Sequence, residues 1–268
     1  MKTAITLFGR YLGISVRSQM QYRGSFVLYA IGQFFTTGVE VLGIWALFDR
    51  FGTLGVWTLA HVAVFYGSVN MAFAVADTFS RGFDSFGSAM VKTGDFDRIL
   101  LRPRSTVFQI AGQDFPLHRI GRFLQGALVF VYGVVVLELD WSAFQFCLLF
   151  LAFVGMFFFF YGLMIFQATL SFWSTESLEV MNVFVYGGVE ACQYPLSIYR
   201  DWFRSFFTYV IPLGCVAYFP IVGVLGVDDP LGSGRVFQML APLAGIAFFS
   251  LSLYCWNFGV RHYTSTGS

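Results

Sequence analysis

The sequence predicts an all-α integral membrane protein with six transmembrane helices, an N-terminal interfacial helix and an outer re-entrant helical pair before the last span. The mean hydropathy is +0.70, 57% of the residues are hydrophobic and only 12% are charged, as is typical of membrane proteins. Several apolar runs reach the roughly 20 residues that a helix needs to cross about 30 Å of hydrocarbon. The links between them are too short for a soluble domain, so residues 1–268 form one membrane domain.

The first element, residues 3–23, has the pattern of a helix lying in the membrane interface. Apolar residues recur at helical spacing on one face, and Arg10 and Arg17 project from the other. A cleaved signal peptide is the alternative. The apolar core, however, begins only near Phe26 and is too long for the apolar region of a signal peptide. We therefore expect the segment to be retained.

Six apolar segments follow as predicted spans. They are residues 26–48, 59–79, 123–137, 144–170, 180–194 and 237–258. Trp57 lies in the short turn before the second span, where an aromatic side chain suits the membrane interface.

The charged residues between the spans predict the orientation. Residues 81–122 contain seven basic and four acidic residues and are the most cationic loop. Basic loops stay on the cytoplasmic side, so this loop and both termini are predicted to be cytoplasmic. The acidic turns at Glu138 and Asp140, and at Asp228 and Asp229, are then outside.

Residues 195–226 are predicted to enter the membrane from the outer face and return. The stretch is apolar, but prolines break it into pieces shorter than a comfortable span. A full crossing would also place the acidic turn after it inside. The alternative, a complete seventh span, is permitted by hydropathy alone. The residues that define this segment are Tyr194, Pro195, Pro212 and Pro220.

The charged loop contains the stretch GDFDRILLRP at residues 94–103. A short helix with a few apolar anchors and charged ends is suited to docking in the groove of a partner protein. Attachment to anionic lipid through the basic residues is an equally good explanation from composition. The candidate docking residues are Gly94, Asp95, Asp97, Arg98, Leu100, Leu101, Arg102 and Pro103.

Four stretches resemble the permease subunits of type 2 ATP-binding-cassette (ABC) exporters, in particular an uncharacterised bacterial subgroup. They are LFDRFGTLGVWTLAHVAVFYG at 47–67, GDFDRILLRP at 94–103, GRFLQG at 121–126 and YPLSIYRDWFRSFFTYVIPLGCVAYFP at 194–220. The sequence departs from the usual pattern at His61, where an acidic residue is common, and at Arg200, where proline is frequent.

The resemblance implies that residues 94–103 form the coupling helix, which seats in a groove of an ATP-binding subunit. It also implies that two permeases, identical or related, enclose the translocation path in the inner (plasma) membrane of a bacterium. The sequence has no G-x-x-x-x-G-K-[ST] segment, so this chain is expected to bind no cofactor, and ATP and Mg²⁺ are expected on the separate ATPase.

Three polar residues inside predicted spans are candidates for the translocation path: Glu40, Asn70 and Glu190. A carboxylate in a bilayer is costly and needs a partner or water. Glu40 is otherwise a protonated side chain held between helices, and Glu190 lies near the end of its span. Asn70, like Gln167, is more often an interhelical hydrogen-bonding group than a ligand.

Other functional classes have little support in the sequence. The net charge of +1 and the absence of a basic soluble domain argue against nucleic-acid binding. The four cysteines lie singly in apolar runs, and no histidine has metal-ligand spacing. Two alternatives to an ABC permease stay open: a transporter driven by an ion gradient, and a membrane scaffold that recruits a cytoplasmic partner.

Overall fold

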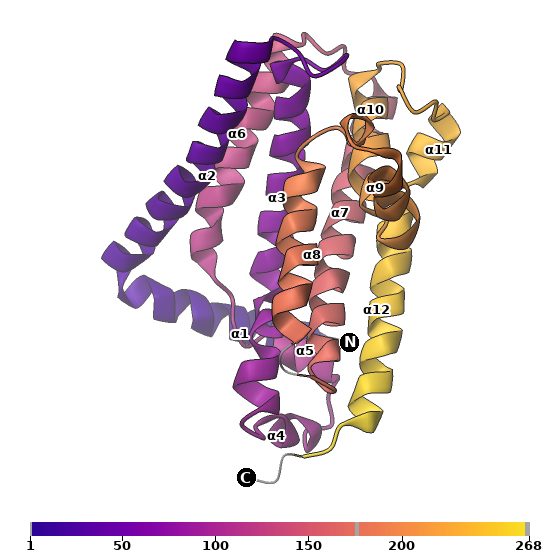
Figure 1. Ribbon diagram of the computed structural model, residues 1–268. Helices are drawn as coiled ribbons and strands as arrows, with labels where there is room; N and C mark the ends of the chain where they lie inside the picture. Colours follow the sequence, from indigo (N-terminus) through magenta and orange to yellow (C-terminus); the bar gives the residue numbers. More distant parts are fainter. Residues whose placement is uncertain (1, 175–176, 266–268) are drawn as a thin grey trace.

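The computed structural model describes residues 2–174 and 177–265, and this part of the chain is helical without a β-strand (Figure 1). Five helices are long and apolar enough to cross a membrane. Two of them are single helices, α2 (Arg23–Phe51) and α7 (Ala143–Leu170). The third is α3 (Leu59–Asp84), which a π-helical turn extends to Val91, and the fourth is the segment Leu117–Val136, which contains α6 (Ile120–Val136). The fifth is the segment Arg235–His262, which contains α11 (Arg235–Leu240) and α12 (Leu243–His262). The predicted all-helical membrane fold is confirmed.

The predicted fifth span forms α8 (Ser177–Cys192), which lies against α3 and α7 (Figure 1). It has 16 residues, or about 24 Å at 1.5 Å per residue, less than the roughly 30 Å of a hydrocarbon core. A sixth apolar unit is formed by the two arms Asp201–Val210 and Gly214–Leu225, which meet at an angle of 84°. The first arm contains α9 (Asp201–Ser205) and the second contains α10 (Phe219–Leu225).

The helical bundle has two distinct ends. The turns between α2 and α3, between α6 and α7, and between α10 and α11 lie together at the upper end of Figure 1. The C-terminal end of the chain lies at the lower end with α4 (Phe96–Leu100) and α5 (Thr106–Ala111). The first helix, α1 (Lys2–Gln21), also lies toward this end and turns sharply away from α2.

Helix α3 forms the centre of the bundle. In its most apolar stretch 83% of the residues are buried inside the protein, compared with 11% in that of α2. It packs between α6 and α7, and its aromatic side chains, such as Phe65 and Phe73, are fully buried. Much of the surface of α2 therefore faces lipid or a second chain, whereas α3 positions polar groups inside the protein.

The loop between the second and third spans is shorter than residues 81–122. Helix α3 continues to Asp84, so Arg81 lies inside a helix, and α6 begins at Ile120, so Arg122 does too. Both arginines fall in ranges that are long and apolar enough to span the membrane. Basic residues at the ends of apolar runs look like loop charges in the sequence, and the three-dimensional structure pairs them with polar groups of other helices.

Candidate functional site

Helix α4 is fixed to the lower end of the bundle by one aromatic side chain. Gly94 has a φ of +75°, a left-handed conformation that glycine adopts without strain, and it turns the chain into α4. Phe96 is then fully buried. Its ring centroid lies 5.1 Å from that of Phe86, 5.5 Å from that of Phe172 and 6.2 Å from that of Trp256. Phe86 and Trp256 belong to two spanning segments and Phe172 to the turn that follows α7, so α4 contacts three separate parts of the bundle.

Two hydrogen-bonding side chains hold the segment that follows α4. The buried amide of Gln109 donates to the carbonyl oxygens of Ile99 at 3.2 Å and Arg104 at 3.3 Å. The indole Nε1 of Trp256 donates to Oγ1 of Thr106 at 2.9 Å, linking α12 to α5. The backbone on both sides of residues 100–103 is therefore tied to the bundle.

Most of the predicted docking residues around these attachments face outward, whereas Gly94 and Asp97 are half-buried. Leu101 is 85% exposed and Leu100 is 41% exposed. Asp95 and Arg98 form an exposed ion pair at 3.4 Å, and Arg102 and Pro103 are exposed as well. Ile99, in contrast, is buried beneath them. The stretch thus has one face that packs on the bundle and one that projects two leucines and several charges into the surroundings.

The end of the chain contacts the same helix. The hydroxyl of Ser265 donates to Oδ2 of Asp97 at 2.6 Å, and the ring of Tyr263 lies 5.0 Å from that of Phe96. Burial and the neighbouring Asp97 carboxylate raise the pKa of Tyr263. Asp97, a predicted docking residue, is half-buried under this tail.

A polar cluster lies midway along the bundle, between α2, α3 and α6. The Tyr66 hydroxyl donates to Oε2 of Glu40 at 3.0 Å, and Oε1 of Gln125 lies 3.4 Å from the same hydroxyl. One turn further along α3, the Asn70 side chain accepts a 2.8 Å hydrogen bond from Nε of Arg122. Two of the three predicted path residues are thus brought together through partners on other helices.

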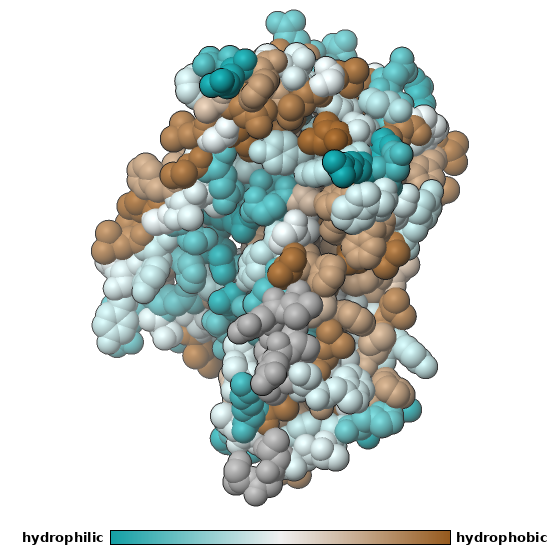
Figure 2. Space-filling view, in the orientation of Figure 1, coloured by the Kyte–Doolittle hydropathy of each residue, from teal (hydrophilic) through white to brown (hydrophobic). Residues whose placement is uncertain are grey.

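The third predicted path residue reaches this cluster from α8. Glu190 is exposed in the single chain and interacts electrostatically with both Glu40 and Arg122. Figure 2 shows hydrophilic surface in the hollow between α2 and α8, bordered by apolar surface on either side. Because a charged side chain facing hydrocarbon costs about 2.5–3.5 kcal/mol on insertion scales, this face is unsuited to contact with lipid tails.

Further polar groups continue toward the lower end. Nε of Arg119 lies 2.8 Å from Oδ2 of Asp77, whose side chain is fully buried. Arg81 pairs with Asp84 at 2.6 Å. Nη1 of Arg119 also donates to Gln33 of α2 at 3.2 Å, so these ion pairs tie α3 to both the start of the third span and α2.

Side-chain amides connect these ion pairs with α8. Gln167 of α7 donates to the Asn182 side chain of α8 at 3.1 Å and lies 3.4 Å from Oδ1 of Asp84. Gln167 is therefore an interhelical hydrogen-bonding group, as its position in a span predicts. The cluster around Tyr66 and Arg122 and the ion pairs of Asp77 and Asp84 together form a hydrophilic line along one side of an apolar bundle.

The sequence alone does not identify several members of this line. Tyr66, Gln125 and Arg122 are single polar residues in long apolar or loop-like stretches, and no spacing in the sequence connects them with Glu40. Nε2 of Gln125, although buried, has no hydrogen-bond partner in the part of the chain that the structure describes. A buried donor of this kind costs free energy unless a ligand or water satisfies it. The only sequence signal is that a polar residue in a span needs a partner.

The predicted re-entrant residues shape the bent pair at the upper end. Pro195 is buried just before a short 3₁₀ turn, and the half-buried Tyr194 precedes it. Pro212 lies at the break between the two arms, and Pro220 starts α10. Proline lacks a backbone N–H and cannot continue a helix from the residues before it, which accounts for the bend.

Metal and redox chemistry find no support in the described ranges. No group of three or more His, Cys, Asp or Glu side chains there could hold a metal ion. The four cysteines are free thiols.

Comparison with known proteins adds one finding. The model of a family described as "ABC-2 family transporter protein" matches residues 34–267, which is most of the chain. No curated protein matches, and no solved structure matches.

Proposed function

The chain belongs to the ABC-2 family of transporter membrane proteins, and from this premise we propose that it is the permease subunit of an ATP-driven exporter. In this proposal it forms the translocation path with a second permease, identical or related. ATP and Mg²⁺ bind to separate ATPase subunits, because the sequence has no phosphate-binding loop of its own. Members of this family typically lack the ATPase domain, which agrees with ATP hydrolysis on a separate subunit.

The observation that carries the proposal is the position of α4. Phe96 fixes the helix to the bundle, and Leu100 and Leu101 are left exposed at one end of it. Exposed apolar anchors on a rigidly held helix match the groove-docking mode of protein recognition. We infer that the ATPase subunit binds here, which makes this end and both termini cytoplasmic in a bacterial inner membrane.

The aromatic contacts of Phe96 suggest how the two activities are coupled. A movement of α4 driven by nucleotide would be passed to the segments that follow α3 and α7 through Phe86 and Phe172, and to α12 through Trp256. Closure of the ATPase subunits would thereby favour one of two arrangements of the bundle. The hydrophilic face with Glu40 and Glu190 is our candidate for the wall of the path, with the second permease opposite it.

Purification and transport assays test the proposal. Tagged chain isolated from its own host in mild detergent should retain a Walker A protein with ATPase activity. Vesicles containing the complex should export only when ATP is supplied. Export that follows a proton gradient without ATP would favour a secondary transporter, and the absence of any transport would favour a scaffold. Either result would contradict the proposal.

A further inference from the structure

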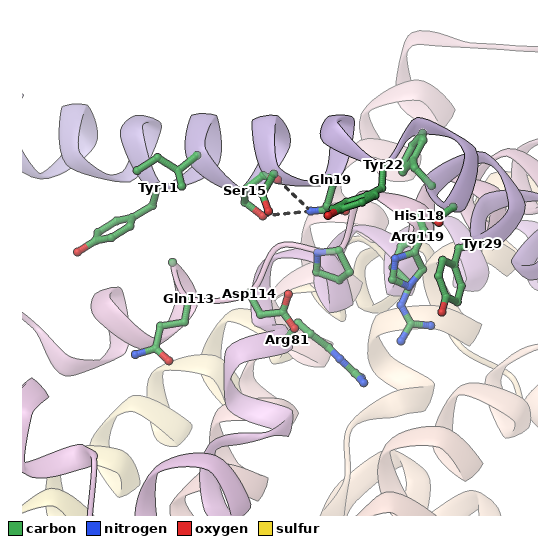
Figure 3. A pocket seen from close by; sticks show the side chains of 16 residues that line it. Tyr11, Ser15, Gln19, Tyr22, Tyr29, Arg81, Gln113, Asp114, His118 and Arg119 are labelled. Carbon is green, nitrogen blue, oxygen red and sulfur yellow. Dashed lines mark hydrogen bonds between the residues drawn. The ribbon is translucent and has the colours of Figure 1, made fainter.

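A cavity of about 870 Å³ lies between α1, the start of α2 and residues 112–119. Figure 3 shows α1 forming one wall, with Tyr11, Ser15 and Gln19 on that side and Arg81 and Arg119 on the other. Its other polar lining groups include Ser18, Tyr22, Tyr29, Asp114 and His118. Because α1 and the segment 112–119 lie toward the same end of the bundle as α4, the cavity is at the level of one membrane surface.

Side-chain hydrogen bonds hold α1 against the far wall of the cavity. Gln19 donates through Nε2 to the carbonyl of Phe115 at 2.6 Å and accepts from the backbone N–H of Leu117 at 3.0 Å. The Ser15 hydroxyl donates to the same Phe115 carbonyl at 3.3 Å. A single glutamine thus satisfies two backbone groups on either side of Pro116 and fixes the distance between the walls.

The N-terminal segment beside the cavity is cationic, whereas the far wall carries Asp114 together with Arg81 and Arg119. Residues 1–39 contain four basic side chains and no acidic one. Arg10 and Arg17 are both exposed, and they lie four residues before and three residues after Ile14, which lines the cavity. Neither arginine lines the cavity itself. Both lie on the neighbouring face of α1, where they place positive charge close to it.

Inside the cavity, Arg81 and Arg119 supply further donors. Each is held by an aspartate, Asp84 and Asp77 respectively, but a guanidinium carries five N–H groups and these contacts use only some of them. The walls also contain the hydroxyls of Tyr22 and Tyr29. Tyrosine is enriched at the depth of lipid headgroups, where its ring is apolar and its hydroxyl is wet.

We propose that this cavity binds the phosphate-containing headgroup of an anionic lipid. The phosphate is recognised by the N–H groups of Arg81 and Arg119 that their aspartates leave free, and headgroup hydroxyls are recognised by the serine and tyrosine side chains. Arg10 and Arg17 strengthen the attraction of the anionic lipid from the neighbouring face of α1. The apolar side chains of Ile14 and Phe26 contact the lipid where its acyl chains begin. A bound lipid would fill the space between α1 and the segment that follows α5, stabilising the clamp at Gln19. Free phosphate shares the recognition chemistry, and the experiment separates the two sources.

The test measures lipids retained by the purified full-length chain. The chain is exchanged into micelles with equal amounts of phosphatidylglycerol and phosphatidylcholine, and native mass spectrometry counts the lipids of each kind that stay bound. One basic residue near an anionic surface is worth roughly fivefold in affinity, so Arg10→Gln with Arg17→Gln should reduce the phosphatidylglycerol preference roughly 30-fold. This assay needs neither the ATPase nor transport, so its result is independent of the proposed function.

Two variants distinguish a site from general surface charge. Ser18→Trp places an indole in the cavity without changing the charge, and it should also abolish the preference. Arg261→Gln removes one exposed charge from the last helix, away from the cavity, and should leave it unchanged. Equal retention of both lipids by the unmodified chain, or an unaltered preference in Ser18→Trp, would overturn the proposal. Displacement of the lipid by millimolar inorganic phosphate would overturn the lipid assignment in favour of a free anion.

Discussion

Arg119 Nε and Asp77 Oδ2 lie 2.8 Å apart, and none of the Asp77 side chain is exposed. The other oxygen of Asp77 lies 3.9 Å from Nη1 of Arg81. An ion pair removed from water is stable only when both partners are present. The pair therefore joins the centre of the bundle, α3, to the segment that leads from α5 into the third span.

Asp77→Asn should destabilise the protein because it leaves the Arg119 guanidinium partly buried without its counter-charge. Removal of one partner of a buried pair costs about 3–5 kcal/mol. The measurement is thermal unfolding of the purified chain in detergent, where the midpoint should fall clearly.

Asp95→Asn is the matched control, since its partner Arg98 is 77% exposed and exposed pairs contribute under about 1 kcal/mol. Its unfolding midpoint should stay close to that of the unmodified chain. Equal midpoints for Asp77→Asn and the unmodified chain would show that the buried pair does not stabilise the bundle.

Replacement of Leu100 and Leu101 by Ala should release the ATPase subunit without unfolding the permease. Both side chains are exposed, so their removal leaves no cavity in the bundle. Anchors at the centre of an interface cost about 2 kcal/mol or more when truncated, or roughly 30-fold in affinity. Co-purification of the ATPase and its stimulated rate of hydrolysis are the readouts.

The control for that experiment is the pair Leu240→Ala and Leu243→Ala, which are 52% and 49% exposed but lie toward the other end of the bundle. These changes should leave the ATPase bound. Undiminished ATPase binding after the loss of Leu100 and Leu101 would place the docking surface elsewhere.

Most of the fold could be predicted from the sequence, because hydropathy reports directly on burial in a bilayer. Residues 144–170 coincide almost completely with α7, Ala143–Leu170. The short helix α8 illustrates the limit. The predicted run at 180–194 is about as long as α8 itself, Ser177–Cys192, and Pro195 marks its end in the sequence. The packing of α8 against α3 and α7, in contrast, depends on the tertiary structure.

The site was less predictable, for a different physical reason. Glu40 and Asn70 could be selected because polar residues in spans are costly. Their connection through Tyr66 and Arg122 depends on how α2, α3 and α6 pack. Phe96 is a similar case. Between two aspartates it resembles part of an exposed loop, and only the tertiary structure shows it as the buried anchor of α4.

Glu40→Gln should slow transport while leaving assembly intact. The amide can still accept a hydrogen bond from Tyr66, but the charge that interacts with Arg122 is lost. A charge-assisted interaction of about 1.5–3 kcal/mol corresponds to a rate change of about tenfold or more if it acts in the rate-limiting step. Export rates in vesicles test this, with Glu138→Gln, an exposed residue of the turn between α6 and α7, as the control. Unchanged export would remove Glu40 from the mechanism.

Phe96→Ala should loosen α4 from the bundle. Truncation of a fully buried phenylalanine costs about 3–5 kcal/mol, and here the lost contacts are those with Phe86, Phe172 and Trp256. Amide hydrogen exchange across residues 94–104 should speed up more than exchange in α7. Exchange that is unchanged in that segment would show that α4 is held mainly by Gln109.

The contact between α7 and α12 depends on two glycines. A Cβ atom added at Gly245 would lie 2.0 Å from the backbone carbonyl oxygen of Gly155. Backbone atoms cannot move aside as a flexible side chain can, so any larger residue would force the two spanning helices apart. The same close approach is absent at Gly43 of α2, where no atom lies within 4 Å of an added Cβ.

Gly245→Ala should therefore destabilise the bundle by about 1–3 kcal/mol, the usual cost of overpacking. Gly43→Ala makes the same chemical change inside a helix where space is open, and it should raise stability by about 0.5–1 kcal/mol because alanine is the better helix former. The two variants should shift the unfolding midpoint in detergent in opposite directions. Since helix propensity alone predicts the same shift for both, a rise in both midpoints would mean that α7 and α12 do not approach as closely as Gly155 and Gly245 indicate.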